Sequence, residues 1–126
     1  MKTVMVLTNV TGNEELDRQR AAEYCRYAAH KGNIPLSPCL CFHGVFKDEL
    51  AGVVEGFLEA RLVKKVDEVW VFGFEQGEAR KKREEAAQKR YGEKVRYFCH
   101  PEIGRELLIC AMYSEELIER LEEMEV

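Results

Sequence analysis

Short runs of consecutive apolar residues recur along the chain and are separated by longer polar stretches. Val4–Leu7 is one such run, and Val69–Phe72 is another that combines β-branched with aromatic side chains. Continuous runs of this length are typical of strands that are buried on both faces. Val95–Phe98 alternates more nearly between apolar and polar residues, as an outer strand does. We therefore predict four strands, at Thr3–Thr8, Ile34–Leu36, Glu68–Gly73 and Lys94–Cys99.

Apolar residues at helical spacing lie between these strands. A helix is predicted from Glu14 to His30, where Asn13 can cap the first turn and acidic residues suit the helix dipole. Ser114 is a second clear N-cap and predicts a final helix after it. The same spacing predicts two further helices, at Lys47–Lys64 and Glu78–Arg90.

Two segments give less regular patterns. Pro35 and Pro38 stand three apart, which disfavours a helix, so we expect a loop after the strand that ends at Leu36. His100–Gly104 is expected to be a turn. The apolar segment Arg105–Tyr113 fits either a short strand or a buried helical turn.

The alternation of strands and helices determines the expected fold class. Crossovers of a dozen or more residues between strands require a parallel sheet with helices on both faces. We expect one α/β domain over residues 1–126, built as a doubly wound, Rossmann- or flavodoxin-like sheet of about four or five strands. The length of 126 residues fits one domain.

Composition limits the cellular location and the classes of partner that we expect for the chain. The chain has 46% hydrophobic residues but no apolar run of 18, so we expect no membrane span. A net charge of −4 argues against nucleic acid as the main partner. The first apolar run is too short for a signal peptide, and five scattered cysteines are typical of a reduced protein. We therefore expect a cytoplasmic location.

Polar and glycine residues follow the first and the central strand. The carboxyl ends of parallel strands meet at one edge of the sheet, where loop amides and helix N-termini face a crevice. We therefore expect a small-molecule site at this edge, with its ligand contacts drawn from Thr8, Asn9, Gly12, Gly73, Glu75, Gln76 and Gly77.

Cys39, Cys41 and His43 alternate along the chain and are residue types that bind zinc. The spacing lacks the second pair of ligands that structural zinc sites have. We therefore predict no metal site, and zinc remains an alternative for these residues.

Three stretches together resemble a known superfamily. They are Ala21-x-x-Tyr24-Cys25-Arg26-Tyr27-Ala28, Gly32-x-Ile34-Pro35-Leu36-x-Pro38 and Asp67–Gly73. Over roughly Lys2–Phe98 the chain resembles the nucleoside 2-deoxyribosyltransferase-like superfamily. The resemblance is to its uncharacterised small bacterial and phage branch, the domains of unknown function DUF4406 and DUF7768.

The resemblance implies a chemistry and a set of residues. In the superfamily's enzymes, a glutamate on the helix after the central strand attacks the anomeric carbon of a deoxynucleoside, and acidic residues hold the sugar. Carried over by position, Asp67 matches the aspartate that opens the central strand, and Glu84 is the candidate nucleophile. In strict register with Gly77, however, the nucleophile position falls on Lys81, and a shift of a few residues is needed to reach Glu84.

The resemblance also implies no cofactor and no metal, a nucleoside or nucleotide ligand, and a homo-oligomer of two or more subunits. One hypothesis is a domain that binds a nucleoside, nucleotide or sugar phosphate and cleaves or exchanges the N-glycosidic bond through a glutamate. The alternative is a catalytically inactive binding or regulatory module on the same scaffold. A third hypothesis is an interaction protein that oligomerises through its acidic C-terminal helix and the helix that contains Gly52 and Gly56.

Overall fold

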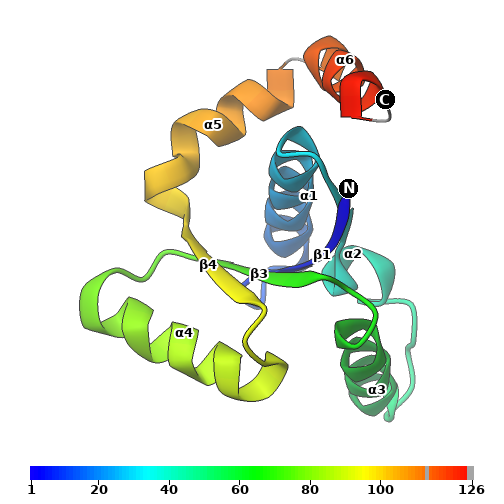
Figure 1. Ribbon diagram of the computed structural model, residues 1–126. Coiled ribbons are helices and arrows are strands. Elements are labelled where there is room, and N and C mark those ends of the chain that lie inside the picture. Colours follow the sequence, from blue (N-terminus) through cyan, green and yellow to red (C-terminus); the bar gives the residue numbers. More distant parts are fainter. Residues whose placement is uncertain (113, 125–126) are drawn as a thin grey trace.

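The computed structural model describes residues 1–112 and 114–124 and shows one parallel sheet between two layers of helices (Figure 1). Its four strands are β1 (Lys2–Leu7), β2 (Asn33–Leu36), β3 (Glu68–Gly73) and β4 (Val95–Cys99), in the spatial order β2-β1-β3-β4. The predicted α/β class is therefore confirmed. All three strand pairs are parallel, and β4 lies at an edge, as its alternating pattern predicts.

The strand order reverses between β1 and β3. From β1 the chain crosses to β2 on one side, and it then returns across the sheet to β3 on the other side of β1. Val4 pairs with Glu68 and Leu7 pairs with Val71, so β1 and β3 run together to the same edge of the sheet. In doubly wound sheets this reversal is where the loops diverge and ligands bind.

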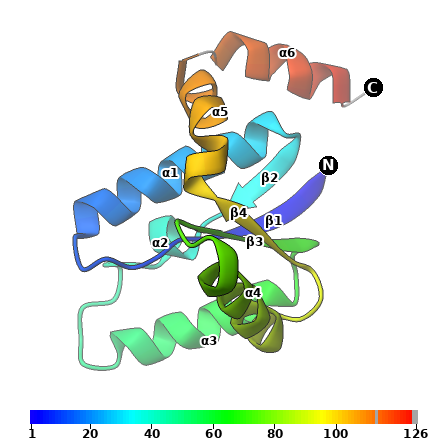
Figure 2. The ribbon, with the colours of Figure 1, turned by 90° about the vertical axis from the view of Figure 1, so that its left-hand side faces the viewer.

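Helices cover both faces of the sheet, as predicted. Figure 2 shows α1 (Glu14–His30) and α5 (His100–Met112) on one face, and α3 (Ala51–Val63) and α4 (Gly77–Tyr91) on the other. The short α2 (Pro38–Cys41) packs against α1 and β1, and α6 (Ser114–Met124) lies against α1.

The face under α1 and α5 holds an aromatic core. The ring of Tyr24 stacks on that of Phe72 with centroids 4.2 Å apart, and Phe72 stacks on Phe98 at 5.1 Å. Tyr27 meets Trp70, Phe72 and Phe98 at tilted or edge-on angles. Such aromatic pairs add stabilisation beyond the area they bury, so this layer holds β3 and β4 firmly to α1.

The opposite face is covered more thinly. Its core includes Met5, Val69 and Val71 from the sheet, but the only α4 residue that is buried is Ala87. No residue of α3 is buried. This thinner covering leaves room between α3, α4 and the sheet.

The expected loop after Leu36 is wrong, because a short helix follows at once. The Ser37 hydroxyl accepts a hydrogen bond from the Leu40 amide at 3.2 Å, and Pro38 occupies the first turn. Proline is disfavoured inside a helix but suits the first position, where its missing N–H needs no partner. Pro38 therefore marks the start of α2, whereas Pro35 lies in β2 and pairs with Val4.

The expected turn at His100–Gly104 is also wrong. Helix α5 begins at His100, directly after β4, with Pro101 in its first turn. Ile103, Leu107 and Cys110 recur at helical spacing and are buried against α1, which resolves the ambiguous segment in favour of a helix up to Met112. Tyr113, the end of that predicted segment, lies outside the described residues.

The second predicted helix begins later than expected. Asp48 accepts a hydrogen bond from the Leu50 amide at 2.9 Å, which holds the residues before Ala51 in a turn.

Among the described helices, none is both long enough and apolar enough to cross a bilayer.

Phe72 is the side chain whose loss we expect to weaken this fold most. It is fully buried and stacks on two aromatic rings, so Phe72→Ala should lower the free energy of unfolding by about 3–5 kcal/mol. Urea denaturation followed by circular dichroism measures this. Phe74→Ala is the matched control, because the neighbouring Phe74 is 41% exposed and should cost roughly half as much or less. Equal losses at the two positions would contradict the assignment of the core.

Candidate functional site

A cavity of about 420 Å³ opens where the strand order reverses. Its floor is formed by the ends of β1 and β3, including Leu7, Thr8 and Val71, and its walls come from α3, α4 and the segment around Phe42. This volume lies in the range of small-molecule sites. The thin covering of this face of the sheet therefore leaves a cavity large enough for a metabolite.

The two helical walls of the cavity carry opposite charges. Glu55 and Glu59 line it from α3, and Arg83 and Arg90 line it from α4. Tyr91 bridges the walls, because its hydroxyl donates a hydrogen bond of 2.6 Å to Glu59 Oε1. Burial and this carboxylate together raise the pKa of Tyr91, so the phenol stays protonated.

Asp17 contributes a buried carboxylate to the same cavity. It is only 2% exposed, and both its oxygens accept from the Thr11 amide at 3.1 Å. The Thr11 hydroxyl adds a bond of 2.7 Å. Asp17 thus fixes the loop between β1 and α1 against the first turns of α1, and this determines the position of the residues after Thr8.

A second polar cluster lies at the end of β3 beside the cavity. Arg83 Nη1 donates to Glu75 Oε1 at 3.0 Å and also to Asn9 Oδ1, while Arg83 Nη2 donates to the Phe72 carbonyl at 3.3 Å. The Tyr97 hydroxyl donates to Glu75 Oε2 at 2.8 Å. We call Asn9, Glu75, Arg83 and Tyr97 the Glu75 cluster. It ties the loops after β1 and β3 to α4 and β4.

The Glu75 carboxylate is ionised in this cluster. Partial burial by itself raises its pKa, but hydrogen bonds from its own amide, Tyr97 and Arg83 outweigh burial and hold the pKa below the ordinary value. Gly73 makes the close packing possible, because a Cβ at this position would collide with the Glu75 carboxylate and the Tyr97 hydroxyl.

Comparison with known families assigns the chain to a protein family. The model of a domain of unknown function, DUF7768, matches residues 2–98. The chain belongs to this family. No curated protein and no solved structure gives a significant match. The matched residues end in β4 and include every element that lines the cavity, whereas α5 and α6 lie beyond them.

The structure brings part of the predicted site of this DUF7768 domain together. Of the nine residues predicted from the sequence, all of which the structure describes, Thr8 alone lines the cavity. Asn9 and Glu75 belong to the Glu75 cluster at its margin. Gln76 donates to Cys99 Sγ at 3.5 Å.

The predicted glycines serve the backbone. Gly12 and Gly77 both have positive φ, of 91° and 60°, which non-glycine residues rarely adopt. They shape the loops after β1 and before α4, while Gly73 permits the close approach of Glu75 and Tyr97. None of these three glycines lines the cavity.

Asp67 lies at the opposite end of the sheet from the cavity. It precedes β3, and its carboxylate accepts from the Thr3 amide at 2.8 Å and the Thr3 hydroxyl at 3.1 Å. These hydrogen bonds lower its pKa. The structure therefore does not bring Asp67 to the predicted ligands, and the residue fastens the start of β3 to β1.

Glu84 is on α4 but outside the cavity. Its carboxylate accepts from Arg80 Nε at 2.9 Å, and Arg80 also pairs with Glu102 of α5 at 3.3 Å. The α4 residues that line the cavity are Arg83, Ala86, Ala87, Arg90 and Tyr91. The structure therefore does not place the predicted nucleophile beside the other predicted contacts.

The sequence interpretation missed the charged walls. Glu55 and Glu59 share one face of α3 with the apolar Leu62, which is half-buried against the sheet. Two carboxylates four residues apart on an inward face are unusual, because charged residues normally occupy the solvent face of a helix. That pattern was the available signal.

The cysteines and histidines do not converge. Cys39 and His43 line the cavity, whereas Cys41 is exposed. Within the described ranges, no three His, Cys, Asp or Glu side chains come together in a way that could hold a metal ion. All five cysteines are free thiols, and burial raises the pKa of Cys39.

Glu75 should make the free energy of unfolding of the domain depend on pH in the acid range. Because folding lowers its pKa, the Glu75 carboxylate stabilises the folded state at pH values above its ordinary pKa of 4.5. This stabilisation is lost as the pH falls through the pKa that Glu75 has in the folded state. Glu75→Gln should therefore be less stable than wild type at pH 7, and the difference should shrink below pH 4.5. Urea unfolding at several pH values measures this. Glu85→Gln, at an exposed position of α4, should show no such trend, and a constant difference for Glu75→Gln would contradict the assignment.

Proposed function

We propose that this DUF7768 domain binds a nucleotide or a related sugar phosphate in the cavity between α3 and α4. The observation that carries the proposal is the pairing of an acidic wall with a basic wall in one cavity at the reversal of the strand order. A sugar phosphate presents hydroxyl donors at one end and an anion at the other, and so matches both walls.

Each part of such a ligand has a complementary group. The carboxylates of Glu55 and Glu59 accept hydrogen bonds from sugar hydroxyls, which carboxylates do strongly when ionised. Arg90 suits a phosphate, because the planar guanidinium donates two parallel hydrogen bonds, and Arg83, whose Nη atoms bond Asn9, Glu75 and the Phe72 carbonyl, adds positive charge. Phe42 supplies an apolar ring at the cavity wall, on which a base can stack. The superfamily resemblance supports the same ligand class.

Binding without turnover is the form of this function that the side chains favour. A glycosyl-transferring enzyme of this type needs a carboxylate beside the anomeric carbon. Glu84 is held by Arg80 on its own helix and lies outside the cavity, and the in-register Lys81 is exposed. A domain that senses or stores a nucleotide needs neither residue.

Cleavage or exchange of the N-glycosidic bond is the second candidate. It is favoured by the carboxylates that already line the cavity, of which Glu59 is bonded to a tyrosine hydroxyl at 2.6 Å. A glutamate at this place can act as nucleophile only if the Tyr91 bond is exchanged for a contact with the sugar. Glu84 would have to leave Arg80 and turn toward the cavity.

The phosphate requirement can be tested by calorimetry. Wild type should bind a nucleoside 5′-monophosphate more tightly than the parent nucleoside, and Arg90→Gln should lose roughly tenfold of the monophosphate affinity. Lys89→Gln is the matched control, because Lys89 is exposed on the same helix and does not line the cavity. If the monophosphates and nucleosides of all common bases give no heat of binding, the proposed ligand class is wrong.

The choice between binding and catalysis requires a separate assay. We expect no release of free base from deoxynucleosides or their monophosphates when the reaction is followed by liquid chromatography. If base is released, Glu59→Gln and Glu84→Gln identify the carboxylate: loss of turnover in one variant alone assigns the nucleophile. Turnover by wild type that one of these variants abolishes would replace the binding proposal by the enzymatic one.

A further inference from the structure

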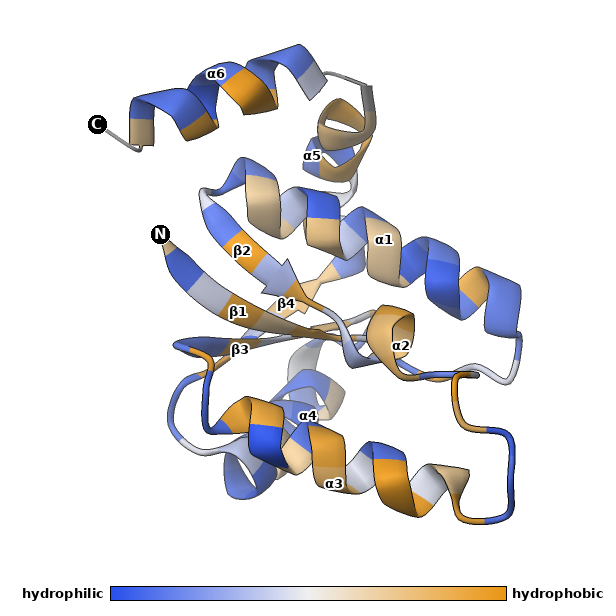
Figure 3. Cartoon of the chain, turned by 90° about the vertical axis from the view of Figure 1, so that its right-hand side faces the viewer, coloured by the Kyte–Doolittle hydropathy of each residue, from blue (hydrophilic) through white to orange (hydrophobic). Residues whose placement is uncertain are grey.

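Helix α3 lies at the margin of the molecule and has several hydrophobic segments among hydrophilic ones (Figure 3). Its inner side places Leu62 and Val63 against the core of the sheet, where they are half-buried. On its outer side Val53 and Phe57 are 55% and 66% exposed. Large apolar side chains that are exposed together on one surface often mark an interaction site, so the outer side of α3 is a candidate contact surface.

The outer side of α3 is built from two neighbouring rows of residues spaced four apart. We call these ten residues the α3 outer surface, and every one of them is exposed. The first row is Asp48, Gly52, Gly56, Ala60 and Lys64, and the second is Glu49, Val53, Phe57, Arg61 and Lys65. The two acidic residues lie in the turn before α3, and the two lysines follow its last residue.

Neither packing nor backbone conformation within the chain requires glycine at the two glycine positions of the first row. A Cβ at Gly52 or Gly56 would meet no atom within 4 Å, and neither residue has a positive φ. Each glycine inside a helix nevertheless costs about 1 kcal/mol relative to alanine. Small residues four apart let a second helix approach closely, which gives these two positions a purpose that the isolated chain does not.

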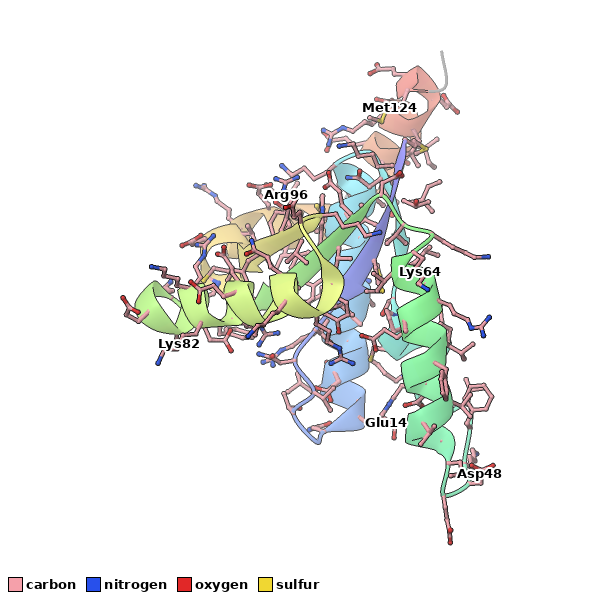
Figure 4. All side chains as sticks on the ribbon, turned by 60° about the horizontal axis from the view of Figure 1, so that its bottom comes forward. Glu14, Asp48, Lys64, Lys82, Arg96 and Met124 are labelled. Carbon is pink, nitrogen blue, oxygen red and sulfur yellow. The ribbon has the colours of Figure 1, made fainter. Side chains whose placement is uncertain are left out.

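The charges at the ends of the rows indicate which partner fits. Both rows begin with an acidic residue, have a small or apolar centre and end with a lysine. Figure 4 shows Asp48 and Lys64 at opposite ends of α3. This order also suits the helix dipole, but the dipole does not account for the exposed Val53 and Phe57 between the charges.

We propose that the α3 outer surface binds the same surface of a second copy of the chain, with the two α3 helices antiparallel about a two-fold axis near Gly56. This arrangement brings the acidic start of each row opposite the basic end of the same row in the partner. Phe57 then packs over the small residues of the facing helix. A two-fold contact of this kind closes on itself, as most homodimer interfaces do.

Other arrangements fit the surface less well. A parallel pair of helices would bring the acidic ends together and the basic ends together, which is unfavourable. An anionic membrane surface would attract Lys64 but repel Asp48 and Glu49. The segment before α3 widens the apolar area, because Val45 and Leu50 are 60% and 64% exposed, which brings the contact closer to the roughly 800 Å² per partner of stable interfaces.

A dimer of this form would also support the candidate site. Glu55 and Glu59, which line the cavity, are on the same helix as the α3 outer surface. Since no residue of α3 is buried within its own chain, a second copy would supply packing that holds this wall in place. The proposal itself rests on the α3 outer surface and does not depend on the ligand.

Sedimentation equilibrium over a range of protein concentrations tests the contact. Wild type should dimerise reversibly, and Gly56→Gln should weaken the dimer by at least about tenfold, because the added side chain blocks close approach. The variant should fold normally, since its Cβ meets no neighbour and glutamine favours helix more than glycine does. Ala79→Gln, an exposed change on α4, should leave the dimer unchanged.

A charge exchange tests the antiparallel arrangement. Lys65→Glu should weaken the dimer, because it places a carboxylate opposite Glu49 of the second copy, and Glu49→Lys should weaken it in the same way. The double variant should recover most of the loss, since the opposite charges are again paired. A wild-type chain that stays monomeric at every concentration, or a dimer that Gly56→Gln and Lys65→Glu both leave unchanged, would overturn the proposal.

Discussion

The parallel pairing of β1 with β3 is the contact that creates the candidate site. The two strands run in register from Val4 and Glu68 to Leu7 and Val71 and end together at one edge of the sheet. Because β2 lies on the far side of β1, the connections that follow the two strands leave in opposite directions. A crevice between those connections is therefore a consequence of topology, before any side chain is considered.

The crevice becomes a cavity because the two faces of the sheet are covered unequally. On one face Tyr24, Tyr27 and Phe72 pack ring against ring, and they hold α1 and the central strands together. On the other face Ala87 is the only buried residue of α4, and α3 has none. The aromatic layer carries much of the stability of the fold, so the opposite layer can leave space for a ligand and for charged groups around it.

Much of this architecture follows from local sequence patterns, and the failures have local causes. The apolar run Val69–Phe72 is buried throughout, as a central strand requires. The pattern failed where proline begins a helix, at Pro38 and at Pro101, because the first turn of a helix tolerates proline. Strand order predicted the edge of the sheet at which the cavity opens, and Thr8 lines this cavity. The positions of Glu55 and Glu59 could not be predicted in this way, because they depend on which side of α3 meets the sheet.

The orientation of α4 decides what the cavity can do. Successive helix positions differ by about 100° around the axis, so neighbouring residues face different parts of the molecule. Arg83 faces the cavity and the Glu75 cluster, while Arg80 and Glu84, one turn apart, pair with each other beside Glu102 of α5. The same helix therefore presents cations to the cavity and keeps its nearest glutamate outside it. A carboxylate that acts on a ligand in this cavity has to come from the other walls, where α3 and Asp17 supply three.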